Sequence, residues 1–171
     1  YKRQGYSVLV SQSNERWEEE KNIVKTMLAK KIDGLAISLA SETTDYKHFD
    51  AVISRGVPVV FFDRVPLDKR SSCVRIDNRT AAYNAVMHLI KQGCTRIVHL
   101  SGPQAISVYK DRQDGYVQAL MDSDIRVDSS LIFENSITLA TGEEAGKKIL
   151  AMPVLPDAIF SAGDYSAMGV M

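Results

Sequence analysis

Several short apolar runs in this chain end directly in polar residues. The clearest is Val59–Phe62, four consecutive strand-forming residues that run straight into Asp63 and Arg64. An unbroken apolar run of this kind is typical of a parallel strand covered on both faces. Comparable runs are residues 74–76 before Asp77 and Asn78, residues 97–100 before Ser101 and Gly102, and residues 158–161 near Asp164. Because open α/β sheets bind ligands at the carboxyl ends of their strands, the pattern predicts one sheet edge that gathers polar groups into a ligand cleft.

Helical periodicity fills the intervals between these runs. We expect helices at residues 14–31, 45–55, 80–92, 108–122 and 141–151, a helix beginning near residue 164, and further strands at residues 6–11, 34–38 and 131–134. Residues 141–144 resemble a capping box, and Gly56 and Gly93 are placed to close two helices. Alternating strands and helices predict an α/β fold with doubly wound parallel sheets, in which about eight strands form one large sheet or two smaller ones.

Charge and cysteine content limit the function classes. Lys plus Arg and Asp plus Glu both number 21 among 171 residues. A nucleic-acid-binding domain usually carries a basic patch, so we expect no DNA contact from the residues shown. No apolar run approaches the roughly 18 residues of a membrane span. Cys73 and Cys94 are expected to be structural thiols, which is consistent with a reducing, cytoplasmic compartment.

The two ends of the chain indicate a fragment. Residues 1–5 resemble the last turn of a helix closed by Gly5, and residues 164–171 resemble a helix barely begun. We therefore expect parts of the domain to be missing at both ends.

Arg112 and Asp63 are the candidate ligand-binding residues in these patterns. Arg112 lies near the start of a helix that follows the Gly102-Pro103 turn, where its guanidinium can fork onto ligand hydroxyls, carboxylate or phosphate, or form a surface ion pair. Asp63 can accept hydrogen bonds from ligand hydroxyls, or it can pair with Arg64 or cap a turn. Both alternatives remain open for each residue. The Asp77-Asn78 pair is expected to cap the next helix.

The patterns that support catalysis are missing from the sequence. His48, His88 and His99 are scattered without metal-ligand spacing, and each is expected to be a satisfied structural histidine. No serine nucleophile elbow, dinucleotide-binding glycine motif or phosphate-binding loop is present. We therefore predict no catalytic residue, metal site or cofactor, and a protein that is not an enzyme.

A set of short motifs in fixed order resembles a known family. The motifs are residues 32–35, 57–64, 74–78, 88–97, 101–103, 112–116, 156–160 and 163–169. Together they cover essentially all of the chain. The sequence resembles the effector-binding domain of LacI/GalR-family bacterial transcription regulators.

The resemblance implies a periplasmic-binding-protein-like type I fold with two Rossmann-like lobes and a ligand cleft between them. Residues 1–77 would form the N-terminal lobe, without its first strand, and residues 78–171 an incomplete C-terminal lobe. The resemblance also implies a cytoplasmic homodimer that binds a small-molecule effector and has no membrane partner. Operator DNA would be bound through a helix-turn-helix domain that is not in this chain.

The resemblance assigns effector-contacting roles to individual residues of this sequence. Arg112 falls on the arginine that grips the effector, and Asp63 falls on a frequent cleft carboxylate. Asp164 is predicted to be an effector contact, although Gly163 replaces an asparagine that several sugar-responsive members carry before it.

Two other predicted effector positions depart from the family pattern. Ile137 stands where some relatives place an aromatic ring that stacks on a sugar or base, and Val108 replaces a polar residue. These departures argue against a simple assignment to a known sugar, so a sugar, a phosphosugar and a nucleoside all remain candidates. We expect a ligand-sensing domain whose effector changes the operator affinity of the dimer. The alternative is the solute-binding protein of a sugar uptake system.

Overall fold

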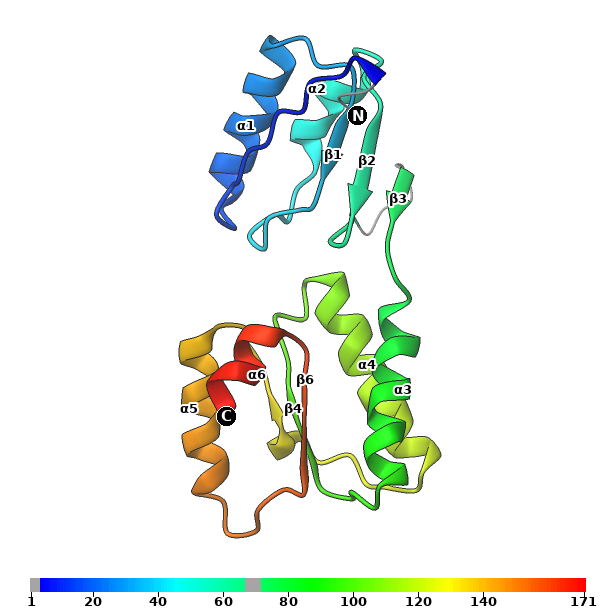
Figure 1. The fold of residues 1–171 in the computed structure, drawn as a ribbon, viewed down its shortest axis with the longest axis vertical. Helices are drawn as coiled ribbons and strands as arrows, with labels where there is room; N and C mark the ends of the chain where they lie inside the picture. The colour runs from blue at the N-terminus through cyan, green and yellow to red at the C-terminus, as the bar shows by residue number, and fades with distance from the viewer. Residues whose placement is uncertain (1–3, 67–71) are drawn as a thin grey trace. The chain divides into compact units, whose positions relative to one another are not determined.

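The computed structural model describes residues 4–66 and 72–171. The chain divides into two compact units, Tyr1–Arg75 and Ile76–Met171, and each contains one three-stranded parallel sheet (Figure 1). The division lies close to the predicted change of lobe after residue 77, and the functional assignment of the lobes stays a prediction. The α/β class and the doubly wound, parallel arrangement are confirmed.

Unit 1 consists of α1 (Trp17–Ala29), β1 (Leu35–Ile37), η2 (Lys47–Phe49), α2 (Asp50–Ile53), β2 (Val59–Phe62) and β3 (Ser72–Val74). The strands lie in the order β1-β2-β3, with Leu35 opposite Val59 and Phe62 opposite Val74. Three acidic residues in the first turn of α1 complement the positive end of the helix dipole.

The apolar core of unit 1 lies on one face of its sheet. Phe61 of β2 packs edge-on against Phe49, with ring centroids 5.1 Å apart, and Val24 of α1 joins the same cluster. Because side chains alternate along a strand, Val60 and Phe62 point to the other face, where they are 36% and 45% exposed. The expectation that β2 is covered on both faces is therefore wrong for the described residues.

The predicted strand at residues 6–11 is also absent. This segment has no strand assignment and no ladder partner in the described part of the chain. Val8, Leu9 and Val10 are 65%, 53% and 87% exposed. A short apolar run alone does not make a strand, because backbone N–H and C=O groups need a neighbouring strand to bond.

Unit 2 consists of α3 (Asn78–Lys91), β4 (Ile97–Leu100), α4 (Ser107–Asp122), η3 (Ser129–Leu131), β5 (Ile132–Phe133), α5 (Leu139–Leu150), β6 (Ala158–Ser161) and α6 (Asp164–Val170). Its sheet has the order β5-β4-β6, and every residue of the central strand β4 is buried. Ile97 packs in the cluster that contains Tyr116 of α4, whereas Val98 packs with Ile149 of α5. The sheet is thus covered on both faces, as Figure 1 shows.

Several predicted boundaries shift in the structure. The strand expected at residues 74–76 is β3 at Ser72–Val74, and the strand expected at residues 131–134 is the shorter β5 at Ile132–Phe133, which directly follows the 3-10 helix η3. The capping box of α5 is formed by Thr138 and Thr141, because Thr138 is the cap and its hydroxyl accepts from the Thr141 N–H. The expected box at residues 141–144 is therefore wrong by one helical turn.

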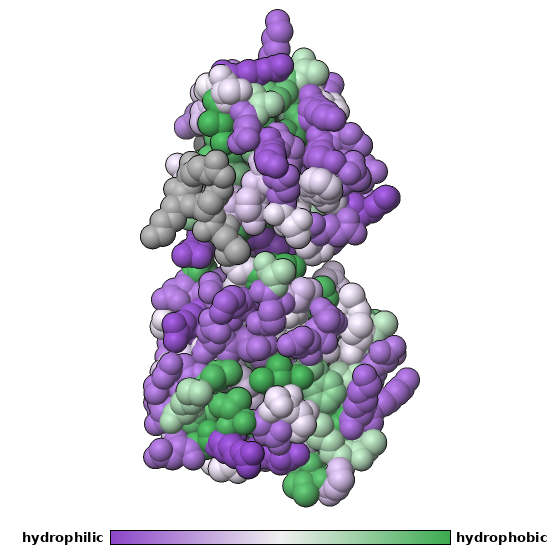
Figure 2. Space-filling view, turned by 180° about the vertical axis from the view of Figure 1, so that it is seen from behind, coloured by the Kyte–Doolittle hydropathy of each residue, from purple (hydrophilic) through white to green (hydrophobic). Residues whose placement is uncertain are grey.

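The strands form two sheets, so the expectation of a single polar edge is wrong. Asp63 follows a strand of the first sheet, whereas Ser101 and Asp164 follow strands of the second. Figure 2 shows polar side chains over most of one face of each unit, with smaller apolar areas between them. Among the described residues, no helix is both long enough and apolar enough to cross a bilayer.

Candidate functional site

Arg112 of α4 is held in place by two neutral acceptors. Its Nε donates to the side-chain oxygen Oδ1 of Asn78 at 3.0 Å, and its Nη1 donates to the carbonyl of Ala162. No carboxylate in the described ranges forms an ion pair with Arg112. Of the two alternatives for this residue, the surface ion pair is therefore excluded within the described chain. The guanidinium is half-buried and its position is fixed by the protein.

The close approach of α3 and α4 brings Asn78 to Arg112. Asn78 is the first residue of α3, and Asp77 caps that helix by accepting from the Thr80 N–H at 3.0 Å. A Cβ atom at Gly115 of α4 would lie 2.3 Å from the carbonyl oxygen of Arg79. Only glycine permits this helix spacing without movement of backbone. The prediction of a cap is confirmed for Asp77, whereas the Asn78 side chain binds Arg112.

A pocket of about 180 Å³ lies beside the guanidinium, entirely within unit 2. It is lined by Ile76, Asn78, Ala81, Ala82, Arg112, Phe160 and Ser161. A mostly apolar wall with a few fixed polar groups is typical of small-molecule sites. Within the described chain, Nη2 of Arg112 makes no hydrogen bond to protein, so it retains donors for a ligand.

The turn that follows β6 is fixed by hydroxyl groups. Ser161 Oγ donates to the carbonyl of Gly163 at 2.8 Å, and the buried Ser166 Oγ donates to the same carbonyl at 3.0 Å. Between these residues, Ala162 is buried and its carbonyl accepts from Arg112. The carboxyl end of β6 is therefore linked to the side chain of Arg112 by a hydrogen bond to a backbone carbonyl.

A stack of aromatic rings supports the pocket wall. His99 lies 4.9 Å from Phe160 and 5.0 Å from Tyr116 between ring centroids, with its Nδ1 3.1 Å from the Phe160 carbonyl. Burial lowers the pKa of His99 to about 4, so the ring is neutral at pH 7 and Nδ1 donates to that carbonyl. Burial raises the pKa of Tyr116 to about 12, and its hydroxyl donates to the carbonyl of Ile97. The stack fixes Phe160 in the wall.

In unit 1, β2 is followed by Asp63, which is exposed, and by Arg64, which forms an ion pair. Asp63 is exposed, with φ at +57°, and its N–H donates to the carbonyl of Val74 at 3.2 Å. Arg64 forms an ion pair with Glu15 and donates to the carbonyl of Leu39 at 3.2 Å. The side-chain hydrogen bond from Arg64 holds the pKa of Glu15 below its usual value. A ligand contact by Asp63 stays a prediction.

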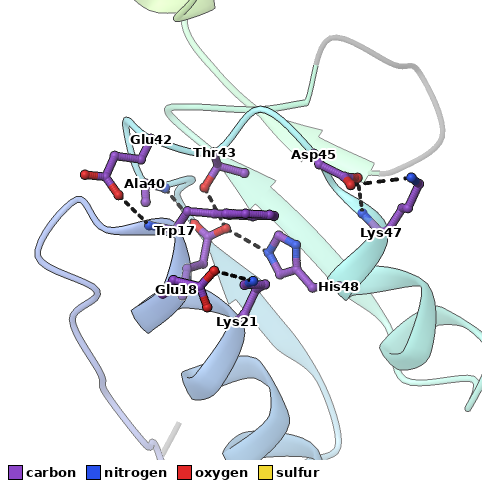
Figure 3. A network of polar contacts seen from close by, with 10 residues as sticks. Trp17, Glu18, Lys21, Ala40, Glu42, Thr43, Asp45, Lys47 and His48 are labelled. Atoms are coloured by element: carbon purple, nitrogen blue, oxygen red, sulfur yellow. Dashed lines mark hydrogen bonds and ion pairs between the residues drawn. The ribbon is translucent and has the colours of Figure 1, made fainter.

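A second polar network in unit 1 centres on the buried carboxylate of Glu20. Figure 3 shows its partners Ala40, Thr43 and His48. The carboxylate accepts from the Ala40 N–H at 2.6 Å, from Thr43 Oγ1 at 2.9 Å and from His48 Nε2 at 2.8 Å. The network ties α1 to the segment that follows β1. His48 Nδ1 and His99 Nε2 are buried without a partner in the described chain, so the prediction of satisfied histidines is only half right.

The remaining predicted site residues lie outside the pocket lining. Val108 is buried in the first turn of α4, Ile137 is half-buried between β5 and α5, and Asp164 is the exposed first residue of α6. Their roles as effector contacts stay predictions. In the described stretches, no group of three or more His, Cys, Asp or Glu side chains could hold a metal ion.

Sequence reasoning missed Asn78 and Phe160 as site residues. A role in capping the next helix already explains an asparagine at position 78. Nothing in the local sequence therefore indicated that its side chain bonds to Arg112 on another helix. Phe160 belongs to an apolar strand run, and its residue type gives no signal that separates a pocket wall from core. Ser161 gives a clearer signal of a site than Phe160 does, because it is a polar residue at the carboxyl end of a strand.

The fold and site define an α/β ligand-binding domain. Residues 1–171 match the family described as periplasmic binding proteins and sugar binding domain of the LacI family, and the chain belongs to this family. It is 33% identical over 170 residues to the HTH-type transcriptional repressor CytR of Escherichia coli strain K12, covering 98% of this chain and 48% of that protein.

Solved structures agree with this assignment. The transcription regulator CcpA of Lactococcus lactis superimposes with a TM-score of 0.87 at 25% identity, covering 99% of this chain and 61% of that one. A complex of the transcriptional regulator CelR with cellobiose gives a TM-score of 0.84 at 25% identity, covering 99% and 51%. The chain spans about half the length of the curated relatives it matches.

Proposed function

We propose that this chain is the effector-sensing part of a bacterial transcriptional regulator. The observation that carries the proposal is Arg112, a half-buried guanidinium fixed by Asn78 and Ala162, with donors free beside a pocket. Its relative CytR is named as a transcriptional repressor and the structurally similar CcpA as a transcription regulator, which supports regulation rather than catalysis. The proposal includes a cytoplasmic location and operator DNA bound by another part of the protein.

The effector acts by favouring one of two conformations. An effector shifts such an equilibrium only by the difference between its affinities for the two states. In a homodimer, the favoured state sets whether the DNA-binding parts reach both half-sites of an operator. Asp63 and Asp164 contribute polar contacts in this scheme, and Arg112 is the main anchor.

The effector is a sugar, a phosphosugar or a nucleoside. Each of these classes presents several oxygen acceptors to a guanidinium and an apolar ring face to a side chain such as Phe160. The bound cellobiose of CelR supports the carbohydrate classes.

The alternative is a solute-binding protein of a sugar uptake system. The family description includes periplasmic binding proteins, and that wording is the observation in its favour. Binding of operator DNA by the full-length protein, released or strengthened by a ligand, separates a regulator from a solute-binding protein.

A thermal-shift screen tests the proposal. The full-length protein is heated with millimolar glucose, fructose, ribose, cellobiose, glucose 6-phosphate, fructose 1-phosphate and the four ribonucleosides. We expect at least one compound to raise the melting temperature, because a ligand at 100 times its Kd stabilises the native state by about 2.7 kcal/mol. No shift with any compound would contradict the proposed effector classes.

A further inference from the structure

The turn that precedes α1 has a strained backbone. Asn14 and Glu15 have φ values of +50° and +65°, and the Arg16 N–H donates to the carbonyl of Ser13 at 3.1 Å. Two central residues with positive φ and this closing hydrogen bond are the features of a type I′ turn, whose second central position favours glycine. Asparagine tolerates the left-handed region, whereas glutamate enters it only with strain. Contacts outside the turn must therefore hold Glu15 in this conformation.

The side chain of Glu15 makes the contacts that offset this strain. Its carboxylate accepts from both terminal nitrogens of Arg64, with Nη2 3.0 Å from Oε1, and its Oε2 also accepts from the Ser41 N–H at 2.8 Å. A guanidinium that meets both carboxylate oxygens is a strong and geometrically specific pair. Arg64 also donates to the carbonyl of Leu39, so the pair joins the turn to the segments that follow β1 and β2.

Two further hydrogen bonds join the turn to the segment after β1. The Glu42 N–H donates to the carbonyl of Glu15 at 3.3 Å, and the Glu42 carboxylate accepts from the N–H of Trp17, the first residue of α1, at 3.1 Å (Figure 3). Residues 14–16 are exposed, and the side chains of Glu15 and Arg64 are 55% and 22% exposed. Exposed ion pairs contribute little free energy each. A strained turn held by such contacts, without buried apolar side chains of its own, is suited to local opening.

We propose that residues 13–16 form a conformational switch in unit 1, in which the Glu15–Arg64 pair is the latch of the closed, left-handed turn. When the pair separates, residues 14 and 15 relax to negative φ and the start of α1 detaches from the segment at residues 40–42. This inference goes beyond the proposed function, because it concerns unit 1 alone and does not depend on an effector. Arg64 directly follows Asp63, so opening of the latch changes the surroundings of a predicted effector contact.

The test is hydrogen–deuterium exchange of the full-length protein, resolved at the amides of Arg16 and Trp17 and corrected for the intrinsic rate of each sequence. Glu15→Gln keeps the strain and weakens the latch, so exchange of both amides should speed up about three- to tenfold. Glu15→Gly removes the latch and the strain together, so exchange should stay closer to wild type. The control Glu18→Gln changes an exposed residue that pairs with Lys21, and its exchange should match wild type.

Two results of this comparison overturn the inference. The first is exchange in Glu15→Gln that is no faster than in Glu18→Gln. The second is exchange in Glu15→Gly that equals or exceeds that in Glu15→Gln, because the pair would then act as a contact and not against strain. Melting temperatures measured on the same samples separate local opening from global unfolding.

If Glu15→Gln fails to fold, substitutions of Asn14 decide, because they leave the Glu15 carboxylate in place. Asn14→Ala should speed exchange of the same two amides and Asn14→Gly should slow it, since glycine adopts positive φ readily and alanine does not. Equal exchange in these two variants overturns the inference.

Discussion

His99 and His48 each bury one ring nitrogen without a protein partner in the described chain. For His99 the consequence is clear, because its side chain packs against two aromatic rings inside unit 2. A proton on this ring would place a charge among apolar groups. The native fold therefore requires the neutral form of His99.

Stability should fall in acid because of His99. The unfolded chain binds a proton at this residue near pH 6.5, whereas the folded protein does so only near pH 4. The unfolded state thus binds more protons in this window, and the free energy of unfolding decreases as pH drops through it, by about 3 kcal/mol from this group. Denaturant unfolding between pH 7 and pH 4 measures this change.

The matched control is exposed His88 of α3. We expect His99→Phe to flatten the dependence on pH in this window and His88→Gln to leave it as in wild type. Equal dependence on pH in all three proteins would show that His99 does not control acid stability.

Glu20 provides a second prediction for a single residue. Its carboxylate accepts from three donors while almost completely buried. Glu20→Gln turns one acceptor oxygen into an NH₂ group that faces donors, so we expect a loss of about 1–3 kcal/mol in the free energy of unfolding. Glu19→Gln changes an exposed neighbour and should cost less than about 0.5 kcal/mol. Chemical denaturation compares the two, and similar losses would refute the importance of the network.

Between helices, glycine positions determine how closely the elements pack. A Cβ at Gly115 would lie 2.3 Å from the carbonyl oxygen of Arg79, whereas one at Gly146 would lie 3.4 Å from the nearest atom, in Val170. Gly115→Ala should therefore push α3 from α4 and reduce the free energy of unfolding by about 1–3 kcal/mol. Gly146→Ala should be neutral or stabilising by up to about 1 kcal/mol, because alanine favours helix.

Thermal and denaturant unfolding of these two variants test the helix crossing. Because the crossing also brings Asn78 to Arg112, Gly115→Ala should weaken binding of any effector found in the screen. A Gly115→Ala protein as stable as Gly146→Ala would contradict the packing account.

The sequence predicted elements better than it predicted their neighbours. Residues 59–62, 97–100 and 158–161 are strands with the expected bounds, because their apolar patterns and the polar residues after them are local signals. Residues 6–11 have an equally suggestive pattern and form no strand, because strand formation depends on a partner. Whether Val60 and Phe62 are buried also depends on whether another element packs on their face of the sheet, and periodicity does not show this.

The candidate site was predictable in the same uneven way. Arg112 was identified from its place after a glycine-proline turn and from family resemblance. Its partners Asn78 and Ala162 are distant in sequence, and their bonds depend on a helix crossing and a strand end that no local pattern specifies. Sequence reasoning therefore identified Arg112 as a candidate but did not identify the residues that hold its side chain.

At the scale of the whole molecule, each unit supplies one parallel sheet and its own polar strand ends. The second unit alone carries the arginine, its two acceptors and the pocket. A ligand that binds there can regulate DNA binding only if it distinguishes two states of the full-length protein. The central claim is therefore that effector response depends on Arg112.

The most direct test is calorimetric binding of the best compound from the screen to full-length wild-type, Arg112→Gln and Lys110→Gln proteins. Lys110 is an exposed cation in the same helix that pairs with Asp114, so it controls for loss of charge. We predict at least tenfold weaker binding for Arg112→Gln, since a hydrogen bond to a charged group contributes about 1.5–3 kcal/mol, and wild-type binding for Lys110→Gln. An unchanged Kd in a folded Arg112→Gln protein would contradict the account.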